Sequence, residues 1–348
     1  MKSHENVTAA KCRLRFALLL AVVILPGTGN AADESKYTYQ KITTLATPCT
    51  PAPPISPTDP TVFFQFDFEP WGINNRGDLV FAADLASRGD LPCGPGVTSD
   101  PQGEGLFLWR NGQLSQITRT GLPAPGGGTL AVGTLAYAPI NERGDVASVF
   151  GLDPFVPDVL EGFVKAGLYR YSSQTQTLSA VVVPFITLAP GLGAFQSTGL
   201  HASLNNSGDI AFAGVVHTTA GTSPHLGQGI FVADGHNQFS KIVVPGDPAP
   251  GGRVFDYSVN PWINEGGDVA FSAHLKNDEC LGGAPYCAES IYVKRRNSGA
   301  IESIAHQGDP APGGGHYRFA WGAQINNLGD IVYMGVLNSP PADPFTPI

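Results

Sequence analysis

Five short segments of the chain place an aspartate carboxylate beside amide groups, and these are the residues whose spacing could support chemistry. Each segment contains an asparagine, two variable residues and then Gly-Asp. Asparagine can bond its own backbone and glycine readily adopts a positive φ, so the pattern is typical of a rigid turn. The repeated residues are Asn74, Gly77 and Asp78; Asn141, Gly144 and Asp145; Asn205, Gly208 and Asp209; Asn264, Gly267 and Asp268; Asn326, Gly329 and Asp330. The alternative is a calcium ion at each turn, although a dedicated calcium loop carries more carboxylates.

Aromatic or histidine side chains lie shortly before each repeated asparagine. They are Trp71, Tyr137, His201, Trp262 and Trp321. If the repeats form a circle of sheets, these aromatic side chains would lie near its central opening. There, together with neighbouring amides, they could stack on sugars. We favour the other interpretation, in which they pack between sheets, and keep them as candidate ligand-binding residues.

Motifs of the common enzyme classes are absent from the sequence. It contains no GxSxG, no HExxH, no P-loop and no GxGxxG that opens a helix. Glycine-rich turns follow proline instead of opening helices, so we expect no phosphate cradle. The histidines do not recur at equivalent repeat positions, as a ring of metal ligands would. We therefore expect no catalytic residue, no metal site and no cofactor, with calcium as the exception to test.

The five turns belong to a repeat that determines the expected architecture. Their asparagines are 67, 64, 59 and 62 residues apart. Each unit also has a Pro-Ala-Pro-Gly-like turn and an aromatic strand, a polar turn and another strand, as in GLFLWRNGQLSQI from Gly105. With 43 Gly, 30 Pro and 14% charged residues in 348, the composition fits many short strands joined by turns. Four short antiparallel strands per unit predict an all-β, β-propeller-like array of about five blades of roughly 60 residues.

The two ends of the repeat region are incomplete units. The last unit offers two clear strands, whereas the segment from Tyr37 resembles the fourth strand of a unit. Pairing of the two would close the last blade with the N-terminal strand and remove two exposed sheet edges. An open array is the alternative.

Residues 1–31 have the pattern of a signal peptide. Basic residues precede the apolar run from Phe16 to Leu25, which small residues follow. An uncleaved anchor is the alternative. Residues 32–348 then form a single repeat domain with net charge −12, no further membrane span and no affinity for nucleic acid. We expect a monomer that is secreted, periplasmic or on the cell surface.

Four cysteines lie outside the predicted signal peptide: Cys49, Cys93, Cys280 and Cys287. An even number in an exported chain predicts disulfides, and we expect Cys280–Cys287 and Cys49–Cys93. Zinc is the weaker alternative, because there is no CxxC pair and no histidine at ligand spacing.

The repeat resembles the exported bacterial tandem-repeat proteins named for NxxGxxxF, and is similar to the HAF-type extracellular repeat proteins. The pattern is met three times, ending at Phe81, Phe212 and Phe271, with Tyr333 as a variant and Ser148 as a departure. The resemblance implies a secreted or cell-surface β-propeller-like protein and identifies no catalytic residue.

Two functions are compatible with these observations. The first is a non-catalytic exported propeller that binds an extracellular glycan or protein through loops on one face. The second is an extracellular polysaccharide hydrolase or lyase on the same scaffold, which would require facing carboxylates with a shifted pKa. The missing enzyme motifs favour the first, and the fold alone does not decide.

Overall fold

The computed structural model describes residues 21–24, 38–41, 51–54, 61–66, 72–87, 103–131, 138–153, 165–216, 228–278 and 289–338. All regular elements in these ranges are β-strands. The described ranges contain no helix of the length and apolarity that a membrane crossing requires.

Each repeat forms one antiparallel sheet, and the sheets are numbered here in chain order. The first sheet contains β3 (Thr61–Phe66), β4 (Gly72–Ile73), β5 (Leu79–Ser87), β6 (Gly103–Arg110) and β7 (Gln113–Arg119). The second contains β8 (Thr129–Leu130), β9 (Val146–Asp153), β10 (Ala166–Ser172) and β11 (Thr177–Val182).

The later repeats keep the same strand order. The third sheet contains β12 (Leu188–Ala189), β13 (Gly193–Leu204), β14 (Ile210–Val216), β15 (Gln228–Ala233) and β16 (Phe239–Val243). The fourth contains β17 (Pro248–Ala249), β18 (Arg253–Ile263), β19 (Val269–Leu275), β20 (Ser290–Lys294) and β21 (Ile301–Ala305). The fifth has two strands, β22 (Tyr317–Ile325) and β23 (Ile331–Leu337).

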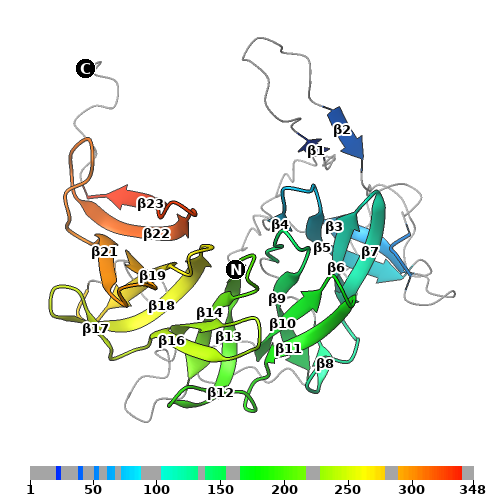
Figure 1. Cartoon of the computed structure of the whole chain (residues 1–348), viewed down its shortest axis with the longest axis horizontal. Helices are drawn as coiled ribbons and strands as arrows, with labels where there is room; N and C mark the ends of the chain where they lie inside the picture. Colours follow the sequence, from blue (N-terminus) through cyan, green and yellow to red (C-terminus); the bar gives the residue numbers. More distant parts are fainter. Residues whose placement is uncertain are drawn as a thin grey trace, which may run out of the picture.

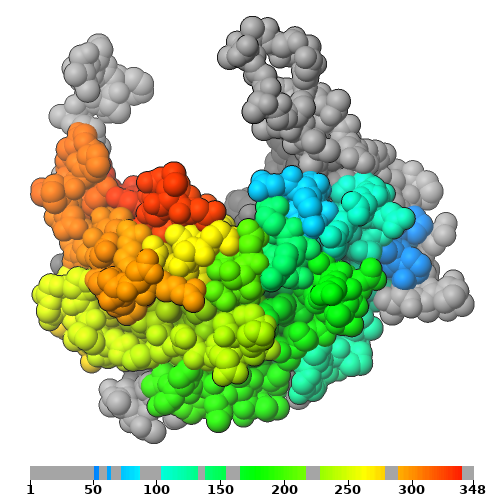
Figure 2. All heavy atoms as spheres, in the orientation of Figure 1, coloured from blue at the N-terminus to red at the C-terminus, as the bar shows by residue number. Residues whose placement is uncertain are grey.

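The five sheets follow one another along an arc, as in a propeller (Figure 1). The first and fifth sheets are the two ends of this arc, and their coloured atoms stand apart at the upper rim of the space-filling view (Figure 2). The predicted all-β, propeller-like array is therefore confirmed; among the described residues its five sheets comprise four of four or five strands and one of two strands, in addition to the separate β1–β2 pair.

The expected closure of the last blade by the N-terminal strand is not what the structure shows. Strand β2 (Thr38–Lys41) pairs instead with β1 (Ala21–Ile24), an apolar run that offers four backbone partners. Figure 1 draws this pair near the first sheet, across the open side of the arc from β22 and β23, and the two pairs form separate sheets. The described residues therefore form an open array, which was the alternative that the sequence allowed.

The hydrophobic core lies between consecutive sheets. Phe195, Phe212 and Phe231 of the third sheet pack against small and aliphatic residues of the second sheet, such as Ala147 and Leu168. The same relation links the fourth sheet to the third, the second to the first and the fifth to the fourth. In each of these four pairs, the later sheet contributes an aromatic face and the earlier sheet a face of small and aliphatic residues. One repeat cannot cover both faces alone, so the array stabilises every unit.

The Asn-x-x-Gly-Asp segment forms the turn between the first two long strands of each sheet. In the third sheet, the Asn205 Oδ1 atom accepts a 2.8 Å hydrogen bond from the Asp209 amide, and the Gly208 amide donates to the Asn205 carbonyl oxygen at 3.1 Å. Gly208 has a φ of 89°. The turn therefore needs asparagine for its side-chain oxygen and glycine for its positive φ.

Candidate functional site

The repeated asparagines connect successive sheets through a ladder of hydrogen bonds. Each side-chain amide donates to the backbone carbonyl oxygen of the next repeated asparagine. The four bonds run from Asn74 to Asn141 (3.0 Å), Asn141 to Asn205 (3.2 Å), Asn205 to Asn264 (3.3 Å) and Asn264 to Asn326 (3.1 Å). These asparagines act within the turn and also hold one sheet to the next.

A second row of bonds runs beside this ladder and was not identified from the sequence. The Glu142 carboxylate accepts the Asn75 amide at 3.1 and 3.2 Å, and the Asn206 Oδ1 atom accepts the Glu142 amide at 2.7 Å. Glu265 and Asn327 continue the row. The available signal was that the residue after the repeated asparagine is Asn or Glu in all five units.

The aspartates of the turns bind donors of the protein. The Asp78 carboxylate accepts the Asn74 side-chain amide at 3.0 Å and the Arg76 guanidinium at 2.8 Å. Asp145 and Asp268 accept the backbone amides of the following hairpins, at 3.0 and 2.9 Å. Within the described part of the chain, no group of three His, Cys, Asp or Glu side chains is arranged to hold a metal ion.

The glycine of the turn also allows an arginine to approach. A Cβ atom added at Gly208 would lie 2.7 Å from the Arg143 Nη2 atom of the preceding sheet. At Gly144 the added atom would lie 3.1 Å from Arg110 Nη1, again from the preceding sheet. The glycine therefore serves the backbone conformation and the contact between sheets.

The candidate ligand-binding aromatics do not share one register position. Trp71 and Tyr137 lie outside the described residues. Trp262 is opposite Ala270, two residues after its turn aspartate, whereas Trp321 is opposite Met334, four residues after its own. His201 lies within the register shift between Thr198 and Ala202 of β13. Burial lowers the pKa of His201 to about 4. Sugar binding by these residues stays a prediction.

All four cysteines of the predicted disulfides lie outside the described residues: Cys49, Cys93, Cys280 and Cys287. Their pairing therefore stays a prediction.

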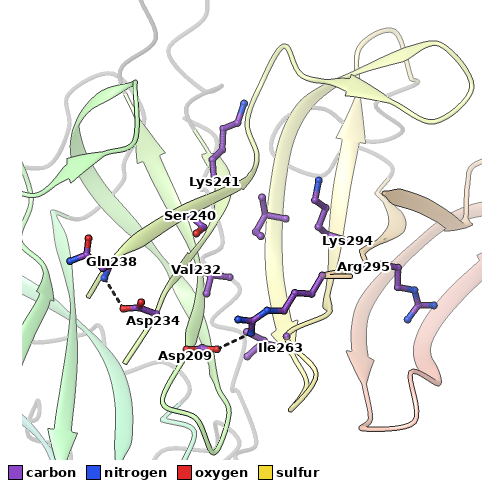
Figure 3. A pocket seen from close by; sticks show the side chains of 12 residues that line it. Asp209, Val232, Asp234, Gln238, Ser240, Lys241, Ile263, Lys294 and Arg295 are labelled. Atoms are coloured by element: carbon purple, nitrogen blue, oxygen red, sulfur yellow. Dashed lines mark hydrogen bonds and ion pairs between the residues drawn. The ribbon is translucent and has the colours of Figure 1, made fainter. Parts of the chain in front are cut away.

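A cleft of about 350 Å³ lies between the third and fourth sheets (Figure 3). The side chains come from the outer strands and turns of the two sheets. Four are basic, namely Lys241, Lys294, Arg295 and Arg296, and two are acidic, Asp209 and Asp234. The excess of basic groups contrasts with the formal net charge of −9 of the whole chain.

Acidic side chains neutralise some of these basic groups. Arg295 contacts Asp268 and Glu302 at 3.1 Å each, and its hydrogen bond to Asp268 raises its pKa. Arg296 lies 3.5 Å from Asp209.

The two lysines differ in their pairing. Lys241 lies 3.0 Å from Asp247, whereas within the described ranges Lys294 forms no ion pair. Lys241 and Lys294 extend in the same direction from the two sheets, and Arg295 turns away (Figure 3). The sequence signal for this site was the Lys-Arg-Arg run at 294–296 in a chain with few charges.

A second polar cluster lies on the face of the fourth sheet that meets the fifth. The His274 Nδ1 atom lies 3.2 Å from Asp256 Oδ2, and the His274 ring stacks on Tyr257 with centroids 5.3 Å apart. Asp256 is the extra residue of a bulge in β18, which turns its carboxylate toward His274. Burial raises the pKa of Glu289 to about 7, and a hydrogen bond with Ser272 partly opposes this.

Solved structures with a similar arrangement match at low similarity. A putative TolB from Agrobacterium tumefaciens has a TM-score of 0.39 and 12% identity, covering 78% of this chain and 70% of that chain. The β-propeller domain of the Trilobed protease from Pyrococcus furiosus has a TM-score of 0.36 and 12% identity, covering 77% of each chain. The GH93 α-L-arabinofuranosidase of Fusarium graminearum has a TM-score of 0.38 and 12% identity, covering 82% and 78%.

No curated protein sequence matches this chain. One family model does match, and it spans residues 22–345. That range includes all five repeats and all strands from β3 to β23. The chain therefore belongs to the family described as "Family of unknown function (DUF7453)".

Proposed function

We propose that this protein is an exported, non-catalytic propeller-like scaffold that binds an acidic extracellular glycan in the cleft between its third and fourth sheets. The supporting observation is the gathering of Lys241, Lys294, Arg295 and Arg296 around one cleft in an acidic chain. Acidic neighbours pair with three of these four basic groups, so Lys294, which forms no ion pair among the described residues, supplies the charge that would attract an anionic ligand. The predicted signal peptide supports an extracellular site of action.

The shape of the cleft favours a sugar over a protein surface. Its volume of about 350 Å³ is near the lower end of the range for small-ligand sites. Lys241 and Lys294 extend in the same direction from the two sheets (Figure 3), and both line the cleft, so an acidic sugar bound there would lie beside both cations. Val232 and Ile263 supply apolar surface beside the charges, as a sugar ring requires.

Calorimetric titration with oligogalacturonate, an acidic oligosaccharide, tests this proposal. We expect binding that weakens between about 50 mM and about 500 mM salt, because exposed charges are screened. Lys294→Gln should weaken binding about tenfold, the effect of losing one charged hydrogen bond. Lys276→Gln, which alters an exposed lysine at the end of β19, is the matched control and should bind normally. Absence of binding, or equal losses in both variants, would overturn the proposal.

One observation supports hydrolysis as a second candidate function. A general acid at neutral pH needs a carboxyl group whose pKa is raised by burial, and the pKa of Glu289 is raised to about 7. Asp256 and His274 lie on the same face of the fourth sheet. Release of reducing ends from polygalacturonate by the purified protein, lost in Glu289→Gln, would establish this activity. Binding without release in both proteins would leave the scaffold function.

A further inference from the structure

Strand β23 is paired on one side only in the described structure. In the other four sheets, the equivalent strand lies between two partners; β14, for example, pairs with β13 and β15. Strand β23 pairs with β22, and no other described strand pairs with it. Within the described ranges, its second edge therefore presents backbone N–H and C=O groups without a strand partner, and such an edge favours the addition of a strand.

One face of this sheet is also apolar and open. Val332 and Met334 are 66% and 55% exposed. Trp321 lies opposite Met334 and stacks on Phe319, with centroids 5.1 Å apart. The residues equivalent to Val332 and Met334 in the third sheet, Ala211 and Ala213, are buried by the fourth sheet. The fifth sheet thus presents the kind of face that other sheets cover with a neighbour.

The fifth sheet is built like the corresponding half of the third. A Cβ atom added at Gly335 would lie 2.6 Å from the Tyr317 ring, and one added at Gly214 would lie 2.7 Å from the Phe195 ring. In the third sheet, Gly214 is opposite Gly229 of the next strand. The backbone of β23 therefore has the geometry to pair with a third strand in the register that joins β14 to β15.

We propose that the open edge of β23 binds an extended segment of another protein, which adds to the sheet as an antiparallel strand. This surface is separate from the cleft of the proposed function. The other sheets indicate what the segment must contain. The aromatic residues of the equivalent strands face aromatic residues, as in Phe81 opposite Phe107, Phe212 opposite Phe231 and Phe271 opposite Tyr292.

The partner segment should therefore place Phe or Tyr opposite Tyr333. By the same register, Leu, Ile or Val would lie opposite Val332 and Met334, and Gly or Ser opposite Gly335. Backbone hydrogen bonds would supply affinity, and the alternating side chains would supply specificity, as in other cases of strand addition. The recognised class is an apolar peptide with the order Gly/Ser, aliphatic, aromatic, aliphatic.

A synthetic peptide with the sequence of residues 228–235, which has this order, is the probe. Fluorescence anisotropy with the full chain should show saturable binding in the micromolar range. Replacement of its phenylalanine by serine should weaken binding at least tenfold. Successive amides of a strand point alternately to its two edges. N-methylation of one alternating set should therefore abolish binding, and methylation of the other set should preserve it.

The protein variants locate the site. Met334→Lys places a charge on the open face, where the exposed side chain contributes little to folding, and should weaken binding at least tenfold. Ser303→Lys adds the same charge to the exposed outer strand β21 and should leave binding unchanged. Both variants should melt at the temperature of the parent chain. No binding to the parent chain, equal effects of the two methylated peptides, or equal effects of the two lysines would overturn the proposal.

Discussion

The side-chain amide of Asn141 donates a 3.2 Å hydrogen bond to the backbone carbonyl oxygen of Asn205, a residue 64 positions further along the chain. Asn205 repeats the contact to Asn264, and the same bond joins every pair of successive sheets. A residue that shapes a local turn therefore also aligns whole sheets. This double role explains why the turn recurs once per repeat.

Asn205→Ala should destabilise the protein by about 2–4 kcal/mol. The buried side chain makes three hydrogen bonds, two with Asp209 and one with Asn264, and each contributes about 0.5–1.5 kcal/mol. Urea denaturation measures the loss. Asn297→Ala, in an exposed hairpin, is the control and should change the free energy of unfolding by less than about 0.5 kcal/mol. Equal losses would show that the ladder does not stabilise the array.

Gly208→Ala and Gly246→Ala should destabilise the protein to a similar extent, by about 1–2 kcal/mol each, the usual cost of a left-handed backbone for a residue with a Cβ atom. Both glycines have a positive φ, 89° and 91°, so both substitutions strain the backbone alike. At Gly208 the new methyl group would also meet the Arg143 Nη2 atom, but this is the end of a flexible side chain that is 53% exposed and can move aside. Thermal melts of the two variants provide the comparison. A clearly larger loss in Gly208→Ala, restored by Arg143→Ala, would show that the arginine is held in place.

Phe212→Ala should destabilise the protein by about 3–5 kcal/mol, the usual loss for a buried phenylalanine. Phe212 is fully buried, and its ring lies 5.6 Å from Phe195 and 5.9 Å from Phe231. Phe185→Ala is the matched control, because Phe185 is 62% exposed, and should cost less than about 1 kcal/mol. Denaturant midpoints distinguish the two. Similar midpoints would contradict a core between the second and third sheets.

Glu289→Gln should flatten the pH dependence of stability. The pKa of Glu289 rises from 4.5 to about 7 on burial, so the folded state holds a proton that the unfolded state releases. Stability therefore falls as pH rises from about 4.5 to about 7, by roughly 3 kcal/mol in total.

Melting temperatures at about pH 5 and about pH 8 check this expectation. The variant should melt above the parent chain at the higher pH and close to it at the lower pH. Glu302→Gln, whose parent carboxylate is 47% exposed, should follow the parent at both. A Glu289→Gln variant with the pH dependence of the parent would show that this carboxyl group is ionised in the folded protein.

Much of the fold could be predicted because its signals are local. The five Asn-x-x-Gly-Asp turns were identified as turns, and the structure forms them with the expected side-chain bonds and positive φ values. Phe212 and Phe271, which end the repeated pattern, lie in the cores between sheets. Periodic turns and strands of regular length specify a repeat architecture before any distant contact is known.

The sequence by itself determined the repeat, the turns and the two-strand last unit, because turn chemistry and strand alternation act over a few residues. Only the tertiary structure determined which residues of successive repeats contact one another. The bulge between Trp321 and Gln324 places Trp321 opposite Met334, a pairing that counting from the asparagine does not give. The cleft and the raised pKa of Glu289 arise where separate sheets meet. Charge clustering and desolvation depend on neighbours that are distant in sequence, so they follow from packing and not from the order of residues.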